Sequence, residues 1–222
     1  LGEIVCMQIP DDRYIDMGKQ DGALLNPTKE EMVSVLDLLV TPVEASVAFD
    51  AVTSTNDTSG VPTSVTFAHT TSGSDRGLGV GIGSAGNVLV STITYGGISM
   101  AKATSTSNGY MVAEVWYLQN PASGTNNVVV TWGSAPAQFT VGAVSVTGNA
   151  GGLGDYKAKW DCCGISSISV DITSHADDFV MDSFADQWNA ARTITEGAGQ
   201  TSRWSYNNGA RKRMGSTEAG AS

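Results

Sequence analysis

The histidines and serines are the residue types that nucleophilic catalysis would use in this chain. A Ser–His–Asp triad needs a histidine close to its nucleophile. Only two histidines are present: His69 ends an apolar run, and His175 lies in a polar stretch beside Asp177 and Asp178. No GxSxG elbow occurs. Because a triad also needs an orienting acid and an oxyanion site, the pattern favours solvated or hydrogen-bonded imidazoles over catalytic ones.

Paired carboxylates are a second route to catalysis, since a glycosidase needs only two of them at a suitable separation. Glu114, Asp178 and Asp182 fall in segments with strand composition. Carboxylates on the wet face of a strand mostly serve solubility, and no other catalytic constellation accompanies these three. The sequence therefore predicts that the protein is not an enzyme.

A glycine-rich segment, Gly81–Gly86, matches the dinucleotide-binding pattern GxGxxG. That pattern binds a pyrophosphate only where a helix begins at its end, so that the helix N-terminal amides face the phosphates. The residues that follow, Asn87–Ile93, have the composition of a strand. The segment is therefore expected to be a glycine-rich hairpin loop, and no nucleotide is expected.

Metal-binding patterns are also absent from the sequence, which has no HExxH, no repeated CxxC and no Asp-x-Asp-x-Asp loop. Asp155 and Asp161 are loop acids that suit calcium only weakly. Cys162 and Cys163 are adjacent, with Cys6 far away, and a vicinal disulfide closes a strained ring, so free thiols are favoured. We expect no metal and no cofactor.

Two groups of side chains are candidates for surface contacts. Arg211, Lys212 and Arg213 form a basic cluster in a Gly/Ser-rich tail, where they suit an acidic surface such as the N-terminal segment of another copy. The alternative is a solvated loop. Trp116 and Trp132 lie in apolar strands and are expected in the core. A glycan platform, if there is one, would use the tryptophans in polar surroundings: Trp160, Trp188 and Trp204.

Composition and charge limit the class of protein. A hydrophobic fraction of 41% suffices for a folded core. The 22 acidic and 12 basic residues give a net charge of −10, which disfavours nucleic acid because phosphates are bound by Lys and Arg. No apolar run reaches the roughly 20 residues that span a bilayer, so no membrane partner is expected. The N-terminus does not resemble a signal peptide, although a leader removed upstream of Leu1 would not be visible.

Residues 1–45 differ from the rest and are expected to form an acidic arm, with nine acidic and three basic residues. Asn26-Pro27-Thr28 followed by acids predicts a helix start, and a short amphipathic helix is expected near residues 28–40. A strand is predicted at Ile4–Ile9. The apolar residues that would make the arm an assembly element are Ile4, Val5, Met7, Ile9, Met32, Val35, Leu36 and Leu39. Periodicity leaves open whether the helix packs on its own domain or on a neighbouring subunit.

Residues 46–222 alternate between short β-rich runs and turn residues, with no helical stretch between them. This pattern is typical of an antiparallel β-sandwich or barrel. The predicted strands are Ser46–Val52, Ser64–Ala68, Leu78–Ile82, Val88–Tyr95, Met111–Leu118, Asn127–Trp132, Phe139–Thr147, Ile165–Ile172, Phe179–Ala185 and Thr201–Tyr206. Strands 128–132 and 141–146 are apolar on both faces, which predicts that they are covered on both sides.

Several short motifs occur in a fixed order in this second part. They are Val88–Met100, Glu114–Pro121, Val128–Trp132, Gly142–Val146, Gly197–Thr201 and Gly215–Glu218. Together they resemble a jelly-roll-like β-sandwich domain of tailed-phage virion proteins and of large secreted bacterial surface proteins. The resemblance implies a non-enzymatic building or adhesion module and supplies no catalytic residues.

The resembling domains continue after the Gly-Ser-Thr turn with one more strand, whereas this sequence stops at Ser222. Either the chain is truncated or its last strand comes from elsewhere, for example from Glu3–Ile9. We expect a capsid decoration protein on the virion surface, which binds copies of itself and a major capsid or other virion protein. The alternative is an extracellular carbohydrate-binding or adhesive module.

Overall fold

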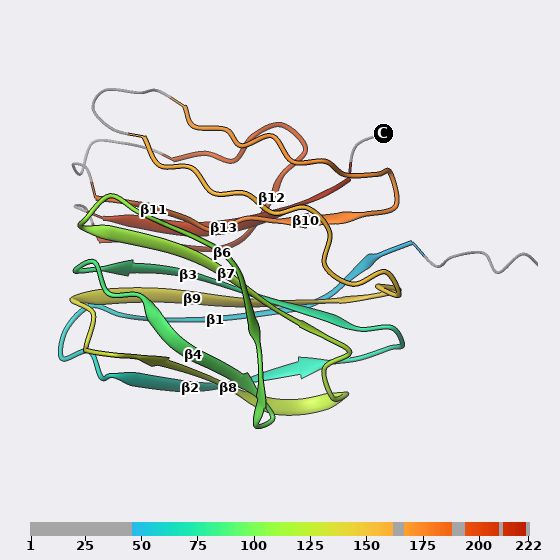
Figure 1. Ribbon diagram of the computed structural model, residues 1–222, viewed down its shortest axis with the longest axis horizontal. Helices are drawn as coiled ribbons and strands as arrows, with labels where there is room; N and C mark the ends of the chain where they lie inside the picture. Colours follow the sequence, from blue (N-terminus) through green and yellow to red (C-terminus); the bar gives the residue numbers. More distant parts are fainter. Residues whose placement is uncertain (1–45, 162–166, 188–193, 209–210, 221–222) are drawn as a thin grey trace, which may run out of the picture. The chain divides into compact units, whose positions relative to one another are not determined.

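The computed structural model describes residues 46–161, 167–187, 194–208 and 211–220. Regular structure in these ranges is entirely β, in antiparallel sheets, which confirms the mainly β prediction (Figure 1). The chain divides into two units, Leu1–Val43 and Glu44–Ser222, and the described residues belong to the second. The predicted acidic arm, with its strand and its helix, lies outside them.

The strands form three sheets. The central sheet has the order β1-β9-β3-β7-β6. Its strands are β1 (Ala48–Asp57), β3 (Gly77–Ala85), β6 (Ala101–Ser107), β7 (Met111–Gln119) and β9 (Gln138–Thr147). The second sheet, β2-β8-β4-β5, consists of β2 (Ser64–Thr71), β4 (Val90–Tyr95), β5 (Ile98–Ser99) and β8 (Gly124–Trp132).

The third sheet is built around β13 (Lys212–Ala219). β10 (Phe179–Met181) and β11 (Phe184–Asp186) pair with one edge of β13, and β12 (Thr201–Asn207) pairs with the other edge. Phe179–Ala185, predicted as one strand, is divided at Asp182 and Ser183. The Asp182 carboxylate accepts a hydrogen bond from the backbone N–H of Ser216 at 2.8 Å, so a side chain occupies a place in the ladder.

The main core lies between the central and second sheets. It is made of inward-facing aliphatic and aromatic residues such as Leu78, Val80 and Ile82 of β3 and Val128 and Val130 of β8. Trp116 and Trp132 are buried, as the sequence predicted. β9 is buried from Phe139 to Val146, which confirms that this strand is covered on both faces. β8 is not, because Val129 lies on its outer face.

The third sheet packs on the opposite face of the central sheet, where glycines alternate with the aliphatic residues of β3. Trp204, Arg213 and Met181 occupy the space that side chains at the four glycines Gly79, Gly81, Gly83 and Gly142 would fill. We call these four glycines the glycine face. The prediction of a hairpin loop at Gly81–Gly86 is wrong. Strand β3 continues to Ala85, and the turn begins at Gly86.

The structure also differs from the sequence expectations at three other places. Residues 212–219, which the sequence assigned to a Gly/Ser-rich tail and a Gly-Ser-Thr turn, form the strand that organises the third sheet. Strands β5 and β6 were not predicted. The described part of the predicted strand Ile165–Ile172, residues 167–172, contains no strand.

Candidate functional site

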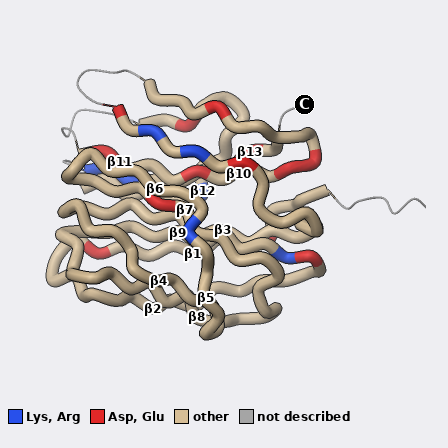
Figure 2. Tube along the Cα trace, in the orientation of Figure 1, with Lys and Arg blue, Asp and Glu red and all other residues tan. Residues whose placement is uncertain are grey.

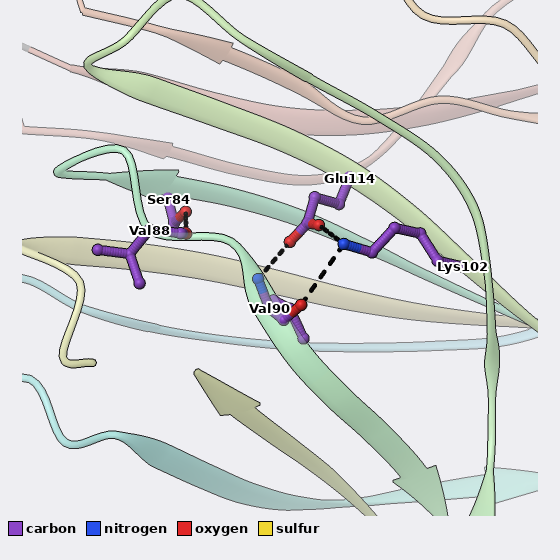
Figure 3. A network of polar contacts seen from close by, with 5 residues as sticks. All are labelled: Ser84, Val88, Val90, Lys102 and Glu114. Atoms are coloured by element: carbon purple, nitrogen blue, oxygen red, sulfur yellow. Dashed lines mark hydrogen bonds and ion pairs between the residues drawn. The ribbon is translucent and has the colours of Figure 1, made fainter. Parts of the chain in front are cut away.

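Glu114 is the most buried carboxylate considered for catalysis, and both of its oxygens are engaged in holding strands together (Figure 3). Oε2 accepts from the Val90 N–H at 2.8 Å, and Oε1 lies 2.6 Å from Lys102 Nζ. Lys102 Nζ also lies 4.9 Å from the centre of the Trp116 ring. The pairing of β4 with β8 and of β6 with β7 is irregular at Val90 and at Lys102. Glu114 therefore compensates two interrupted ladders and is not available as a general acid.

His69 is buried beside Asp50 and two serines, but these groups do not form a triad. The His69 Nδ1 lies 3.1 Å from the Thr53 hydroxyl. Asp50 accepts hydrogen bonds from the Ser72 N–H and hydroxyl and from the Ser145 hydroxyl, the last at 2.7 Å. Burial opposes the ionisation of Asp50, yet these hydrogen bonds outweigh it and lower its pKa. Burial lowers the pKa of His69, which therefore stays neutral near pH 7.

The other two candidate acids also have structural partners. Asp178 accepts from the His175 N–H at 2.6 Å, and both residues are exposed. Asp182 accepts from the Ser216 N–H and hydroxyl and from the Gln200 amide. Burial raises the pKa of Asp182, and the hydrogen bonds from Ser216 only partly oppose this shift. Within the described residues these acids hold loops and the third sheet.

The basic cluster is not the surface patch that the sequence suggested. Lys212 and Arg213 are buried, and only Arg211 retains partial exposure. Arg213 lays its aliphatic stem over Gly83 and donates from Nη2 to Gln138 at 2.7 Å. Burial, reinforced by Arg211, lowers the pKa of Arg213 to about 10. A partner reaching this cluster from solvent would contact Arg211.

The three tryptophans proposed for a glycan platform differ in their exposure to solvent and in whether the structure describes them. Trp204 is 4% exposed and packs on the glycine face, so it cannot stack on a sugar. Trp188 lies outside the described residues. Trp160 is 56% exposed. The structure therefore removes Trp204 from the candidate platform and leaves Trp160 exposed to solvent.

Trp160 belongs to a segment, residues 153–161, in which every residue is exposed. We call it the aromatic segment. Leu153, Tyr156 and Trp160 place large apolar side chains in solvent there, with Tyr156 at 53% exposure. Two contacts tie the segment to residues 171–173: Asp155 accepts from the Thr173 N–H at 2.9 Å, and Lys157 donates to the Asp171 carbonyl at 2.9 Å.

The outer face of the second sheet carries hydroxyl groups and no charge. Ser64, Thr131 and Thr92 lie opposite one another across β2, β8 and β4. We call this surface the threonine face, and its residues are Ser64, Thr66, Ala68, Thr70, Thr92, Thr94, Thr125, Asn127, Val129 and Thr131. Neighbouring strands lie about 4.8 Å apart, and alternate residues along a strand are roughly 6.8 Å apart, so the hydroxyls form regular rows.

None of the residues of β2, β4, β5 and β8 is Asp, Glu, Lys or Arg, although 15% of the chain is charged (Figure 2). The threonine face was not predicted from the sequence, although the alternation of residues along β2 indicates it. Ser, Thr and Ala alternate with apolar or buried residues in 64–71, and no charge interrupts the strand.

A hollow lies at one end of the threonine face, with a volume of about 430 Å³. It is lined by Thr94, Gly96, Gly97, Thr125, Asn126, Asn127 and Val129. Gly96 and Gly97 form a two-residue hairpin turn between β4 and β5, and both have positive φ, 55° and 83°. Glycine adopts this conformation without strain, and its lack of a side chain leaves the backbone bare at the rim.

Comparisons of the chain with protein-family models, with curated proteins and with solved structures find no match. In the part of the chain that the structure describes, no three His, Cys, Asp or Glu side chains are grouped to hold a metal ion. The same residues contain no helix long and apolar enough to cross a membrane.

Proposed function

We propose that the protein is a non-enzymatic structural subunit of an assembly, a capsid decoration protein of a tailed-phage virion with a jelly-roll-like sandwich. The aromatic segment is the observation that carries this proposal. Tyr156 and Trp160 are more than half exposed, and Tyr and Trp are enriched in protein interfaces and among their energetic hot spots. A segment exposed along its whole length but anchored through Asp155 and Lys157 suits contact with a neighbouring subunit.

The N-terminal arm has a place in the same proposal. Among the described residues β6 is at the end of the central sheet and pairs with β7 alone, so its outer edge offers backbone groups to a further strand. We assign the strand predicted at Ile4–Ile9, with its apolar residues Ile4, Val5, Met7 and Ile9, to an edge of this kind in a neighbouring copy. The acidic residues of the arm also match the charge of the partly exposed Arg211, and a contact between them would be weak and sensitive to salt.

The test is the mass of the protein in solution and its copy number on purified particles. We expect a concentration-dependent oligomer or particle-bound copies, weakened about tenfold or more by Trp160→Ala with Tyr156→Ala. Tyr110→Ala is the matched control, because Tyr110 is 65% exposed at a different turn. A wild-type protein that stays monomeric and does not bind particles would contradict the proposal.

A further inference from the structure

We propose that the hollow on the threonine face binds a neutral oligosaccharide. The residues that line the hollow include two with hydroxyl groups, Thr94 and Thr125, and two with side-chain amides, Asn126 and Asn127. Its volume is about 430 Å³, and it is open to solvent rather than enclosed, which suits a polar ligand that stays partly hydrated. It does not depend on Trp160, Trp188 or Trp204, so it is a different site from the aromatic platform considered first.

The hydrogen-bonding groups of the hollow match those of a sugar. Each hydroxyl of a sugar both donates and accepts, and so do the threonine hydroxyls and, through separate atoms, the asparagine amides. Val129 supplies an apolar floor on which the C–H groups of a pyranose can lie. Gly97 has no neighbour within 4 Å of the position of an added Cβ, so a ligand can approach its backbone.

The absence of charge selects among ligands. A phosphate, sulfate or carboxylate group needs a cation or several N–H donors to replace its hydration, and a cationic ligand needs a carboxylate. The strands that form this face contain none of these charged residues. Neutral hexose or N-acetylhexosamine oligomers are therefore preferred over sialylated or sulfated ones.

The face is also held in shape before any ligand arrives. The Thr70 and Thr125 hydroxyls lie 2.7 Å apart across β2 and β8, and the Gly96 N–H donates to the Asn127 carbonyl at 3.0 Å. A preorganised site avoids the entropy cost of ordering side chains on binding. A shallow polar site still binds weakly, so useful affinity comes from many copies, which rests on the proposed assembly; avidity contributes about 100- to 10,000-fold.

The experiment is a titration of the isotopically labelled full chain with neutral oligosaccharides, followed by the amide resonances in two-dimensional NMR spectra. We expect shifts at Gly96, Gly97 and residues 125–127. Sialylated and sulfated oligosaccharides of the same length serve as the charged comparison. From the concentration dependence of the shifts, we expect them to bind with at least tenfold lower affinity. The same spectra report whether each variant is folded.

The decisive variant is Thr94→Val/Thr125→Val, which removes two hydroxyls from the hollow and keeps the shape of the side chains. Its matched control is Thr92→Val/Thr131→Val at the other end of the same face. Both pairs take one residue from β4 and one from β8, and both remove a hydroxyl that lies near one on β2, Thr70 or Ser64. We expect about tenfold weaker binding for the first pair and less than twofold for the control.

Three results would overturn the inference: no shifts at the hollow with any neutral oligosaccharide, equal binding of charged ones, or equal losses in the two variant pairs. The titration is also possible on the Tyr156→Ala/Trp160→Ala protein, which is expected to assemble about tenfold or more weakly. Failure of the assembly proposal and failure of the sugar site are therefore observed separately.

Discussion

The two outer sheets are attached to the central sheet by different physical means. The second sheet joins it through a cluster of buried aliphatic and aromatic side chains that includes Val80, Ile82 and Val130. The third sheet joins it by close approach to bare backbone, with the Trp204 ring lying over Gly81 and Gly142. One strand, β3, serves both interfaces because side chains alternate across a strand.

This difference shows where each interface is sensitive. An interface of branched side chains loses contacts when a side chain is shortened, and the loss grows with the cavity that remains. An interface of glycines fails when a side chain is added, because sheet backbone cannot move aside without breaking its ladder. The two sheets differ in charge as well: the strands of the second sheet contain no charged residue, whereas those of the third contain Asp186, Arg203, Lys212, Arg213 and Glu218, of which Lys212 and Arg213 are buried.

The largest expected effect separates the two interfaces by removing a tryptophan from each. Trp204→Ala leaves a cavity over backbone that cannot collapse, and we expect a loss of about 3–5 kcal/mol in the stability of the third sheet. Hydrogen exchange should show lower amide protection in β13 while β8 keeps its protection. The matched control, Trp132→Ala, removes the ring that lies 5.0 Å from Phe139 in the main core, and it should lower protection in all three sheets. Equal loss in β8 and β13 for both variants would show that the layers unfold as one.

A smaller effect is expected when a methyl group is added to the glycine face. In Gly142→Ala the new Cβ would lie closer than 3.0 Å to the Trp204 ring, and we expect about 1–3 kcal/mol of destabilisation in urea unfolding. Gly133→Ala is the control, because its nearest neighbour would be Ser91 Oγ at an ordinary 3.4 Å. The double variant Gly142→Ala/Trp204→Ala should lose less than the sum of its single changes. Strict additivity would contradict direct contact as the cause.

The sequence predicted strands and buried residues correctly where the residues next to one another in the chain are apolar. The apolar runs at 128–132 and 139–147 predicted strands that the structure contains, and the tryptophans inside apolar runs are buried. The prediction failed for Trp204, whose neighbours in sequence are polar. Its burial depends on Gly81, Gly142 and Gly215, two of which are far away in the chain, so no local window could reveal it.

Strand β13 was missed for a related reason. Residues 212–219 begin with two cations and include Gly215, a composition that indicates a turn or a tail. The glycine is required because the Trp204 ring fills the space of its side chain, and the cation at 213 is tolerated because its stem covers Gly83. The candidate hollow was likewise out of reach, since it depends on the register of β4 and β8 and on the turn at Gly96 and Gly97.

The smallest expected effect is the change of stability with pH, which has opposite signs for His69 in the second sheet and Asp182 in the third. Burial holds the pKa of His69 below its ordinary value of 6.5, so the unfolded chain takes up this proton before the folded one. His69 therefore contributes stability above pH 6.5 that is lost as the pH falls through its folded pKa, by at most about 1.4 kcal/mol per pH unit. Asp182 in the third sheet has the opposite sign, because its raised pKa makes the folded state gain stability as the pH falls toward 3.8.

Urea unfolding at a series of pH values from above 6.5 to about one unit below it measures the His69 contribution. We expect the free energy of unfolding of the wild type to decrease as the pH is lowered through this range. In His69→Gln it should be nearly independent of pH, whatever the absolute stability of that variant. Asp182→Asn is the control: it lies outside the core around His69 and should keep the wild-type slope over this range while losing the gain expected at lower pH. If His69→Gln kept the wild-type dependence of stability on pH, His69 would not be the group through which acid destabilises the protein. The acid sensitivity would then lie outside the core beneath the second sheet.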